Sequence, residues 1–205
     1  QLIDVTTGYH LWAERYDREM QDIFAVQDEV THQIVSALQV KLTESEQQCC
    51  FGRTPTTNME AYECFLRGLE FLSQRSREAN AQARELFERA IQLDANFAAA
   101  YARLGRTYML DWSFQWSDDA ILPERAAALA RQAAALDPAL PGAHQTLAYV
   151  YLMQKQFDQA ITEAEEAVRL DPNDADACVT LGEILSCAGR PAEALGYIEK
   201  ALLLD

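Results

Sequence analysis

A repeated spacing of small and apolar residues limits how this chain can fold more than any other feature of its sequence. Gly182 aligns with Ala148, 34 residues earlier, and the residues around both positions match as well. The matched pairs are Leu147 with Leu181, Tyr151 with Leu185, Ala160 with Ala194, and Ala167 with Ala201. Gly105 and Gly68 take the same place at spacings of 43 and 37 residues. Such a period is typical of repeat proteins, in which each unit buries its apolar face against its neighbours.

The spacing predicts four units, which cover residues 61–97, 98–140, 141–174 and 175–205. Small residues recur where two helix axes must approach closely, and larger apolar residues recur between them. Pro138 and Pro172 each follow a Leu-Asp pair and cannot continue the preceding helix, so they mark the turn into the next unit. The unequal spacings require insertions, and the larger insertion falls at residues 111–120.

These residues resemble the tetratricopeptide repeat (TPR) family, in which each unit is a pair of antiparallel helices. The chain has 205 residues with eight Gly and six Pro, a composition that favours helices over turn-rich folds. We therefore predict a mainly α fold. Its main part is a right-handed TPR α-solenoid of four helix-turn-helix units over residues 58–205.

The residues before the repeats predict a short β-hairpin and then an amphipathic helix. Residues 2–5 and 9–16 have the pattern of two strands joined by a Thr-Thr-Gly turn. Apolar residues then recur at every third or fourth position over residues 23–42, which is the stripe of an amphipathic helix. Two strands alone are marginally stable in water, so we expect this hairpin to belong to a larger sheet.

A linker separates this amino-terminal part from the repeats. Gly52 and Pro55 favour irregular structure, and the pattern from Thr57 to Glu60 predicts a capping box at the start of the first repeat helix. The sequence therefore predicts an αβ segment at 1–44 and a linker at 45–57.

The amino-terminal segment carries a second resemblance. The resemblance rests on Asp4, Gly8 and residues 11–14, 22–24 and 27–29. They lie in the segment QLIDVTTGYHLWAERYDREMQDIFAVQDEVTHQIVSAL. They resemble the end of the TolB-like domain found in bacterial class III adenylate/guanylate cyclases. In that family the order is a cyclase catalytic domain, a TolB-like domain and then TPR repeats.

This resemblance implies that the chain is the carboxy-terminal part of a cyclase. Gln1 falls inside an expected strand and Asp205 at the end of an expected helix, so we expect both ends to be cut. The catalytic residues, including the metal-binding aspartates, would then lie upstream of Gln1. Transcription regulators with a winged-helix head carry similar tails, so the alternative is the interaction tail of such a regulator. The residues upstream of Gln1 distinguish the two.

Composition argues against several classes of function. The chain holds 17 Lys and Arg against 32 Asp and Glu, and its net charge of −15 repels phosphate backbones. No apolar run reaches the roughly 18 to 20 residues that a transmembrane helix needs. The five cysteines form an odd set without CxxC spacing, which favours reduced thiols. We expect a cytoplasmic chain that binds no nucleic acid and inserts in no membrane.

No motif in the chain indicates catalysis or a cofactor. His10, His32 and His144 are far apart, and none lies in an HExxH or CxxC-paired arrangement. Gly-rich phosphate loops and nucleophile elbows are absent from the sequence. We therefore expect no catalytic, cofactor-binding or metal-binding residues, and we interpret the chain as a protein-protein interaction or self-association scaffold.

The first helices of the units predict a groove for a protein or peptide partner. In the TPR family these helices line the concave face, and the matching residues are Phe65, Leu69, Ala102, Arg106, Gln145, Tyr149, Val179 and Glu183. They do not form the Lys, Arg and Asn clamp by which some members hold a peptide carboxylate. We expect a mostly apolar groove with Arg103 and Arg106 as polar anchors. The alternative is that these residues pack inside the chain. The groove could also take a segment of the parent protein itself, and the helix at 23–42 is one candidate.

Two further surfaces are candidates for contacts. Trp112, Phe114 and Trp116 crowd three aromatic side chains into the predicted insertion, which suggests a contact hot spot. Packing against the lengthened second unit is the alternative. The apolar last turn at 201–204 and the edge of the hairpin suggest a homodimer.

Overall fold

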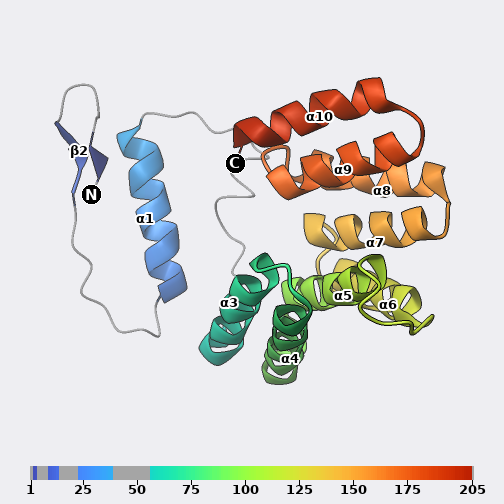
Figure 1. Cartoon of the computed structure of the whole chain (residues 1–205). Helices are drawn as coiled ribbons and strands as arrows, with labels where there is room; N and C mark the ends of the chain where they lie inside the picture. The colour runs from blue at the N-terminus through green and yellow to red at the C-terminus, as the bar shows by residue number, and fades with distance from the viewer. Residues whose placement is uncertain (1, 4–8, 14–22, 39–55, 205) are drawn as a thin grey trace. The chain divides into compact units, whose positions relative to one another are not determined.

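The computed structural model describes residues 2–3, 9–13, 23–38 and 56–204 of the chain. The chain divides into two compact units, Gln1–Thr54 and Pro55–Asp205. In Figure 1 the first unit is blue and the second runs from teal to red.

The first unit contains two short strands and one described helix. Strands β1 (Leu2–Ile3) and β2 (His10–Trp12) are antiparallel, with Leu2 opposite Trp12 and Ile3 opposite His10. Helix α1 (Ile23–Ala37) follows. The turn at 6–8, the rest of the predicted second strand and the linker up to residue 55 lie outside the described residues. The assignment to a TolB-like domain therefore stays a prediction.

Eight helices make up the described part of the second unit, and they follow one another as four pairs. The pairs are α3 (Met59–Ser73) with α4 (Arg77–Leu93), α5 (Ala98–Ser113) with α6 (Leu122–Leu136), α7 (Pro141–Met153) with α8 (Phe157–Leu170), and α9 (Ala175–Cys187) with α10 (Pro191–Leu204). Each second helix packs on its own partner, and α4, α6 and α8 also pack on the first helix of the next pair. The stack in Figure 1 confirms the predicted solenoid of four helix-turn-helix units.

Small residues let the two helices of each pair approach closely, as the repeat pattern predicted. Each second helix carries two alanines, seven residues apart, that are at most 6% exposed; they are Ala83, Ala90, Ala126, Ala133, Ala160, Ala167, Ala194 and Ala201. On the facing side, a Cβ atom at Gly68 of α3 would meet Cε1 of Phe87 at 2.6 Å. A larger residue at either place would have to push the helices apart.

The first helix of the solenoid has a different cap from the predicted one. Asn58, not Thr57, is the N-cap residue, and its Oδ1 accepts a hydrogen bond from the backbone N–H of Ala61 at 3.1 Å. Asn58 also donates from Nδ2 to the carbonyl oxygen of Leu93 at 3.0 Å, which ties the start of α3 to the end of α4. Asparagine is among the most favourable N-cap residues, so the shift by one position has a clear cause.

The turn inside each helix pair passes through a residue with a left-handed backbone. The φ angles are +50° at Arg75, +55° at Gln115, +59° at Lys155 and +79° at Gly189. Glycine adopts this conformation without the clash that a Cβ atom causes. Three of the four turns therefore carry strain that glycine would relieve.

A polar cluster fixes α5 on α4 next to the insertion. Asp111 accepts hydrogen bonds from Nδ2 of Asn80 at 2.6 Å and from Nη2 of Arg84 at 2.5 Å. The guanidinium of Arg84 also lies 4.4 Å from the ring centroid of Tyr108. The Arg84 and Asp111 side chains are 23% and 13% exposed. Such charge-assisted bonds at low exposure are stronger than their counterparts in water.

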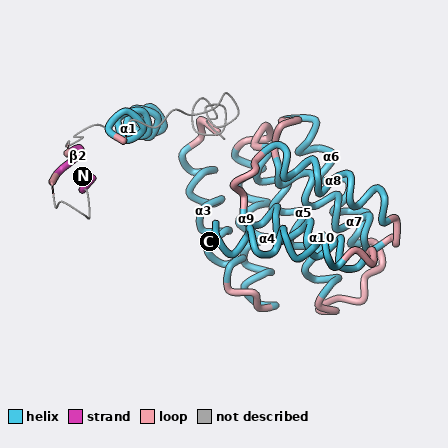
Figure 2. Tube along the Cα trace, turned by 90° about the horizontal axis from the view of Figure 1, so that it is seen from above, coloured by secondary structure: helices cyan, strands magenta, loops and turns pink. Residues whose placement is uncertain are grey.

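Part of the predicted insertion is helix. Helix α5 has 16 residues and continues to Ser113, whereas α7 and α9 have 13 each. The remaining connection, residues 114–121, is the longest between described helices of the second unit and is drawn in pink in Figure 2. Among the helices in the described ranges, none combines the length and the apolar character that crossing a bilayer requires.

Candidate partner-binding pocket

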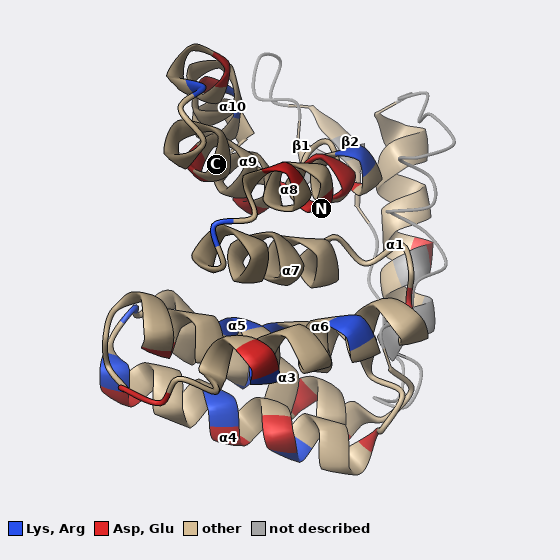
Figure 3. Ribbon diagram, turned by 90° about the vertical axis from the view of Figure 1, so that its right-hand side faces the viewer, with Lys and Arg blue, Asp and Glu red and all other residues tan. Residues whose placement is uncertain are grey.

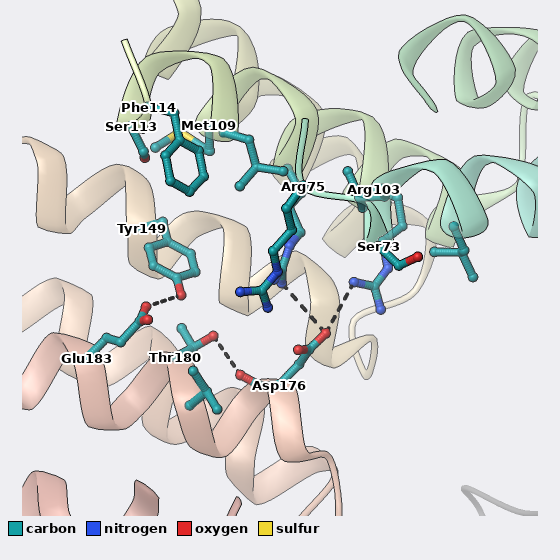
Figure 4. A pocket seen from close by; sticks show the side chains of 15 residues that line it. Ser73, Arg75, Arg103, Met109, Ser113, Phe114, Tyr149, Asp176, Thr180 and Glu183 are labelled. Carbon is teal, nitrogen blue, oxygen red and sulfur yellow. Dashed lines mark hydrogen bonds and ion pairs between the residues drawn. The ribbon is translucent and has the colours of Figure 1, made fainter. Parts of the chain in front are cut away.

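A pocket of about 490 Å³ lies on the face that the first helices of the four pairs share. Its walls come from α3, α5, α7 and α9 and from the turns that end α3 and α5 (Figure 4). The lining residues are Leu69, Leu72, Ser73, Arg75, Arg103, Arg106, Met109, Leu110, Ser113, Phe114, Tyr149, Asp176, Val179, Thr180 and Glu183. Residues up to 114 positions apart in the chain thus meet in one cavity because the repeats stack.

Three arginines and two acids give this pocket a net positive charge in a strongly acidic chain. The arginines are Arg75, Arg103 and Arg106, and the acids are Asp176 and Glu183. The ribbon of Figure 3 shows Lys and Arg positions on α5 in blue. An excess of one positive charge against −15 for the whole chain makes the pocket an electrostatic exception.

The two α5 arginines share one loosely held partner. Nη1 of Arg103 and Nη1 of Arg106 each lie 3.8 Å from Oδ2 of Asp176. Hydrogen bonds between nitrogen and oxygen are normally 2.7 to 3.2 Å long, so these two ion pairs are too long to be hydrogen bonds. Burial, and next the positive charge of Arg106, lower the pKa of Arg103 below its usual value. The pocket thus keeps two cations close together.

Arg75 adds a third guanidinium from the opposite wall. It occupies the left-handed position between α3 and α4, and its side chain projects into the pocket toward α9 in Figure 4. Within the described ranges the structure gives Arg75 no ion pair or hydrogen bond through its guanidinium. Arg75 is exposed, so its N–H donors are open to water or to a ligand and have no protein acceptor among the described residues.

The far end of the pocket is a tyrosine paired with a glutamate. The hydroxyl of Tyr149 donates to Oε2 of Glu183 at 2.5 Å. Burial, and next the negative charge of Glu183, raise the pKa of Tyr149 well above its usual value. Tyr149 therefore stays protonated and covers part of the Glu183 charge. Because Glu183 is paired in this way, the positive charge of the arginines is the main charge that the pocket offers to a ligand.

Apolar side chains form the wall between the charged groups. Leu69, Leu72 and Met109 contribute to this wall. Phe114 is 53% exposed and stacks on Trp116 with ring centroids 4.9 Å apart. A cavity with apolar walls and a few convergent polar groups is typical of a binding site.

Six of the nine residues predicted to form or anchor the groove line this pocket, and Ala102, which is 2% exposed, is not among them. They are Leu69, Arg103, Arg106, Tyr149, Val179 and Glu183. Phe65 instead packs in the core, with ring centroids 5.8 Å from Phe87 and 4.8 Å from Phe97. Gln145 is 2% exposed and donates to Oδ2 of Asp174 at 2.7 Å, so it joins α7 to the start of α9. Both residues lie one helical turn before a lining residue, on the part of the helix that the neighbouring unit covers.

Sequence reasoning missed Arg75 and Asp176. Asp176 lies three residues before Val179 on α9, so extending the helical spacing by one turn would have found it. Arg75 follows the last residues of α3, and its role depends on a backbone conformation that the sequence pattern does not predict.

The three aromatic residues predicted in the insertion have different environments. Trp112 lies in the last turn of α5 and is partly buried, so its placement in a loop was wrong. Trp116 is partly buried as well, and Phe114 alone of the three lines the pocket. Their role as a contact hot spot stays a prediction.

The lining combines Arg, Asp, Glu, Tyr, Ser and Thr side chains with aliphatic residues and Phe114, and it includes no cysteine or histidine. Across the described residues, no three His, Cys, Asp or Glu side chains are grouped so that they could hold a metal ion.

Comparison with known proteins agrees with the helical repeats. Residues 141–174 match the family "Tetratricopeptide repeat", and this range is the third helix pair, α7 with α8. The other three pairs have the same order and packing. The second unit is therefore a TPR solenoid.

Two relatives are much longer than this chain. Over 163 residues the chain is 41% identical to "Putative adenylate cyclase 3" of Rhizobium meliloti (strain 1021), which covers 78% of this chain and 27% of that protein. Over 124 residues it is 27% identical to "Superkiller protein 3" of Schizosaccharomyces pombe (strain 972 / ATCC 24843), which covers 60% and 9%. The aligned region thus spans about a quarter or less of each relative.

Two solved structures match the chain at low identity and low TM-score. "Crystal structure of MamA" is 19% identical, with a TM-score of 0.47 over 92% of this chain and 96% of that one. "First TPR of Spaghetti (RPAP3) bound to HSP90 peptide SRMEEVD" is 14% identical, with a TM-score of 0.49 over 67% and 99%. With TM-scores below 0.5, neither bears on the site of this chain.

Proposed function

We propose that this chain is a non-catalytic scaffold that binds a protein or peptide partner in the pocket of its TPR solenoid. The observation that carries the proposal is the convergence of three guanidinium groups on one pocket, where Asp176 is the one acid that pairs with any of them among the described residues. Cations that lie close together without a matching number of acids repel one another, and an anionic group of a partner would relieve this repulsion. Leu69, Arg106, Tyr149 and Val179 would contact that partner, with Phe114 at the rim.

Capture of partners by the immobilised chain tests this function. Extract from a bacterium that encodes the chain is passed over wild-type protein and over the Arg106→Glu variant, and bound proteins are identified by mass spectrometry. The matched control is Arg131→Glu on α6, where the arginine is exposed and outside the pocket. We expect a specific set of proteins that the pocket variant loses and the control retains. The same proteins on all three columns would contradict the proposal.

The parent of this scaffold is proposed to be an adenylate or guanylate cyclase, with the chain as its carboxy-terminal regulatory region. Support comes from the 41% identity to a protein named as a putative adenylate cyclase, of which the match covers 27%. In this proposal residues 1–44 end a TolB-like domain, 45–57 are a linker, and the four units at 58–205 regulate the cyclase. The sequence upstream of Gln1 tests it, because a winged helix there would refute it.

Self-association through α10 is a second proposal with its own support. Leu195, Leu202 and Leu203 are 58%, 75% and 88% exposed. An exposed apolar face of this kind favours burial against another protein surface. We expect light scattering to give a dimer mass at micromolar concentration and a monomer mass for Leu202→Lys. A monomer in both samples would contradict it.

A further inference from the structure

We propose that the pocket selects a partner segment in which one or two Asp or Glu side chains lie among apolar residues. The inference rests on the proposed scaffold function and names the chemistry of its ligand. The carboxylate would enter between Arg75, Arg103 and Arg106, and the apolar residues would contact Leu69, Leu72 and Phe114.

The geometry of the arginines indicates an anionic ligand group. Arg75 comes from the turn after α3, whereas Arg103 and Arg106 come from one face of α5, and all three line the same cavity (Figure 4). Repulsion between such cations is unfavourable unless an anion lies among them. Asp176 compensates the positive charge of Arg103 and Arg106 only in part, because both of its ion pairs are 3.8 Å long. A carboxylate bound between the guanidiniums could accept shorter, two-pronged hydrogen bonds.

The charges around the arginines limit how acidic the ligand can be. The lining carries three positive and two negative groups, an excess of one, inside a chain of net charge −15. A phosphate group with nearly two negative charges would also face Asp176 and Glu183 at close range. A long acidic tract would meet the acidic surface outside the pocket. Isolated carboxylates therefore fit better than phosphate or a polyacidic tail.

The apolar wall supplies the rest of the specificity. Leu69 and Leu72 follow each other on one face of α3, and Phe114 is 53% exposed beside Trp116. Arginine and exposed aromatic side chains are the residue types that contribute most to binding at protein interfaces. An apolar residue next to the carboxylate would bury this surface.

The left-handed backbone at Arg75 provides a clean variant. Arg75→Gly removes the guanidinium and relieves strain at φ +50°, so loss of binding cannot be attributed to unfolding. Lys155→Gly is the matched control, because Lys155 has φ +59° in the equivalent turn between α7 and α8 and is exposed outside the pocket. We expect both variants to unfold at a slightly higher temperature than wild type.

A positional-scanning library of acetylated and amidated decapeptides tests the selection with the full chain. We expect enrichment of Asp or Glu at one or two positions next to apolar residues. For the best peptide, Arg75→Gly and Arg106→Gln should each weaken binding about tenfold, as expected for a lost charge-assisted hydrogen bond. Lys155→Gly should bind like wild type, and added salt should weaken wild-type binding.

Other outcomes would overturn this inference. One is a library without enrichment of Asp or Glu, and another is peptide binding that neither arginine variant weakens. A third is enrichment confined to a second library with free carboxyl termini, because that result would assign the site to a terminal carboxylate. Inorganic phosphate that competes as well as the peptide would assign it to phosphate. If partner capture still depends on Arg106 in these cases, the scaffold function stands and the acidic ligand alone is wrong.

Discussion

Replacement of Gly68 by alanine tests whether close approach of paired helices holds the solenoid together. The new Cβ atom would lie 2.6 Å from Cε1 and 2.9 Å from Cζ of Phe87. The Phe87 ring is completely buried and its centroid lies 5.8 Å from that of Phe65, so it has little room to move. Overpacking of this kind costs about 1 to 3 kcal/mol.

The helix itself opposes this cost. Alanine is favoured over glycine in a helix interior by about 0.5 to 1 kcal/mol, so the net loss should be roughly 1 kcal/mol. Gly196→Ala is the matched control, because Gly196 is exposed in α10 and a Cβ atom there would meet nothing within 4 Å. The same chemical change should therefore stabilise the chain at Gly196 and destabilise it at Gly68.

Urea unfolding followed by far-ultraviolet circular dichroism measures both effects. At equal slope, the midpoint should fall for Gly68→Ala and rise for Gly196→Ala. In thermal unfolding, a loss of 1 kcal/mol corresponds to a fall of about 2 to 4 °C for a chain of this size. A Gly68→Ala variant at least as stable as wild type would show that α3 and α4 do not need their close contact, and the packing argument would fail.

Two further predictions concern polar groups. Asp111→Ala should lower the free energy of unfolding by about 2 kcal/mol, which is less than the roughly 3 to 5 kcal/mol of a fully buried ion pair because Arg84 is partly exposed. The control Asp118→Ala, at an exposed site, should change the free energy of unfolding little. Equal effects of the two variants in urea unfolding would contradict this prediction. Because burial raises the pKa of Tyr149, the stability from its protonated hydroxyl is complete below the unfolded pKa of about 10 and is lost as the pH rises through the folded pKa. As the pH rises above about 10, the urea midpoint of unfolding should therefore fall less steeply for Tyr149→Phe than for wild type. Equal slopes would show that the protonated hydroxyl of Tyr149 does not stabilise the fold.

The repeat spacing was sufficient to predict most of the fold. Gly68, Gly105 and Gly182 mark where the first helix of a pair faces the second, and buried alanines recur at fixed distances on the second helices. Such close approach has few solutions in a helical chain, so the small residues and the prolines after Leu-Asp predicted four pairs. The capping residue of α3 and the end of α5 were less predictable, since local hydrogen bonds decide them.

The candidate pocket was predicted in part. Arg103, Arg106, Tyr149 and Glu183 follow from the rule that first helices line one face, because helical spacing alone places them. Phe65 was assigned to the groove for the same reason, yet it packs with Phe87 and Phe97. Spacing gives the direction of a side chain from its helix, and it does not give the depth to which the next helix covers that side chain.

The class of fold, the number of repeat units and the acidic character of the chain could all be predicted from the amino-acid sequence alone. These follow from the order of residue types, which local propensity and periodicity translate directly into helices and their apolar faces. The tertiary structure decided which residues share a cavity. Arg75 and Asp176 line the same pocket because the stacking of four units and a left-handed turn bring them there, and a shared cavity across 101 positions of the chain has no signature in either segment alone.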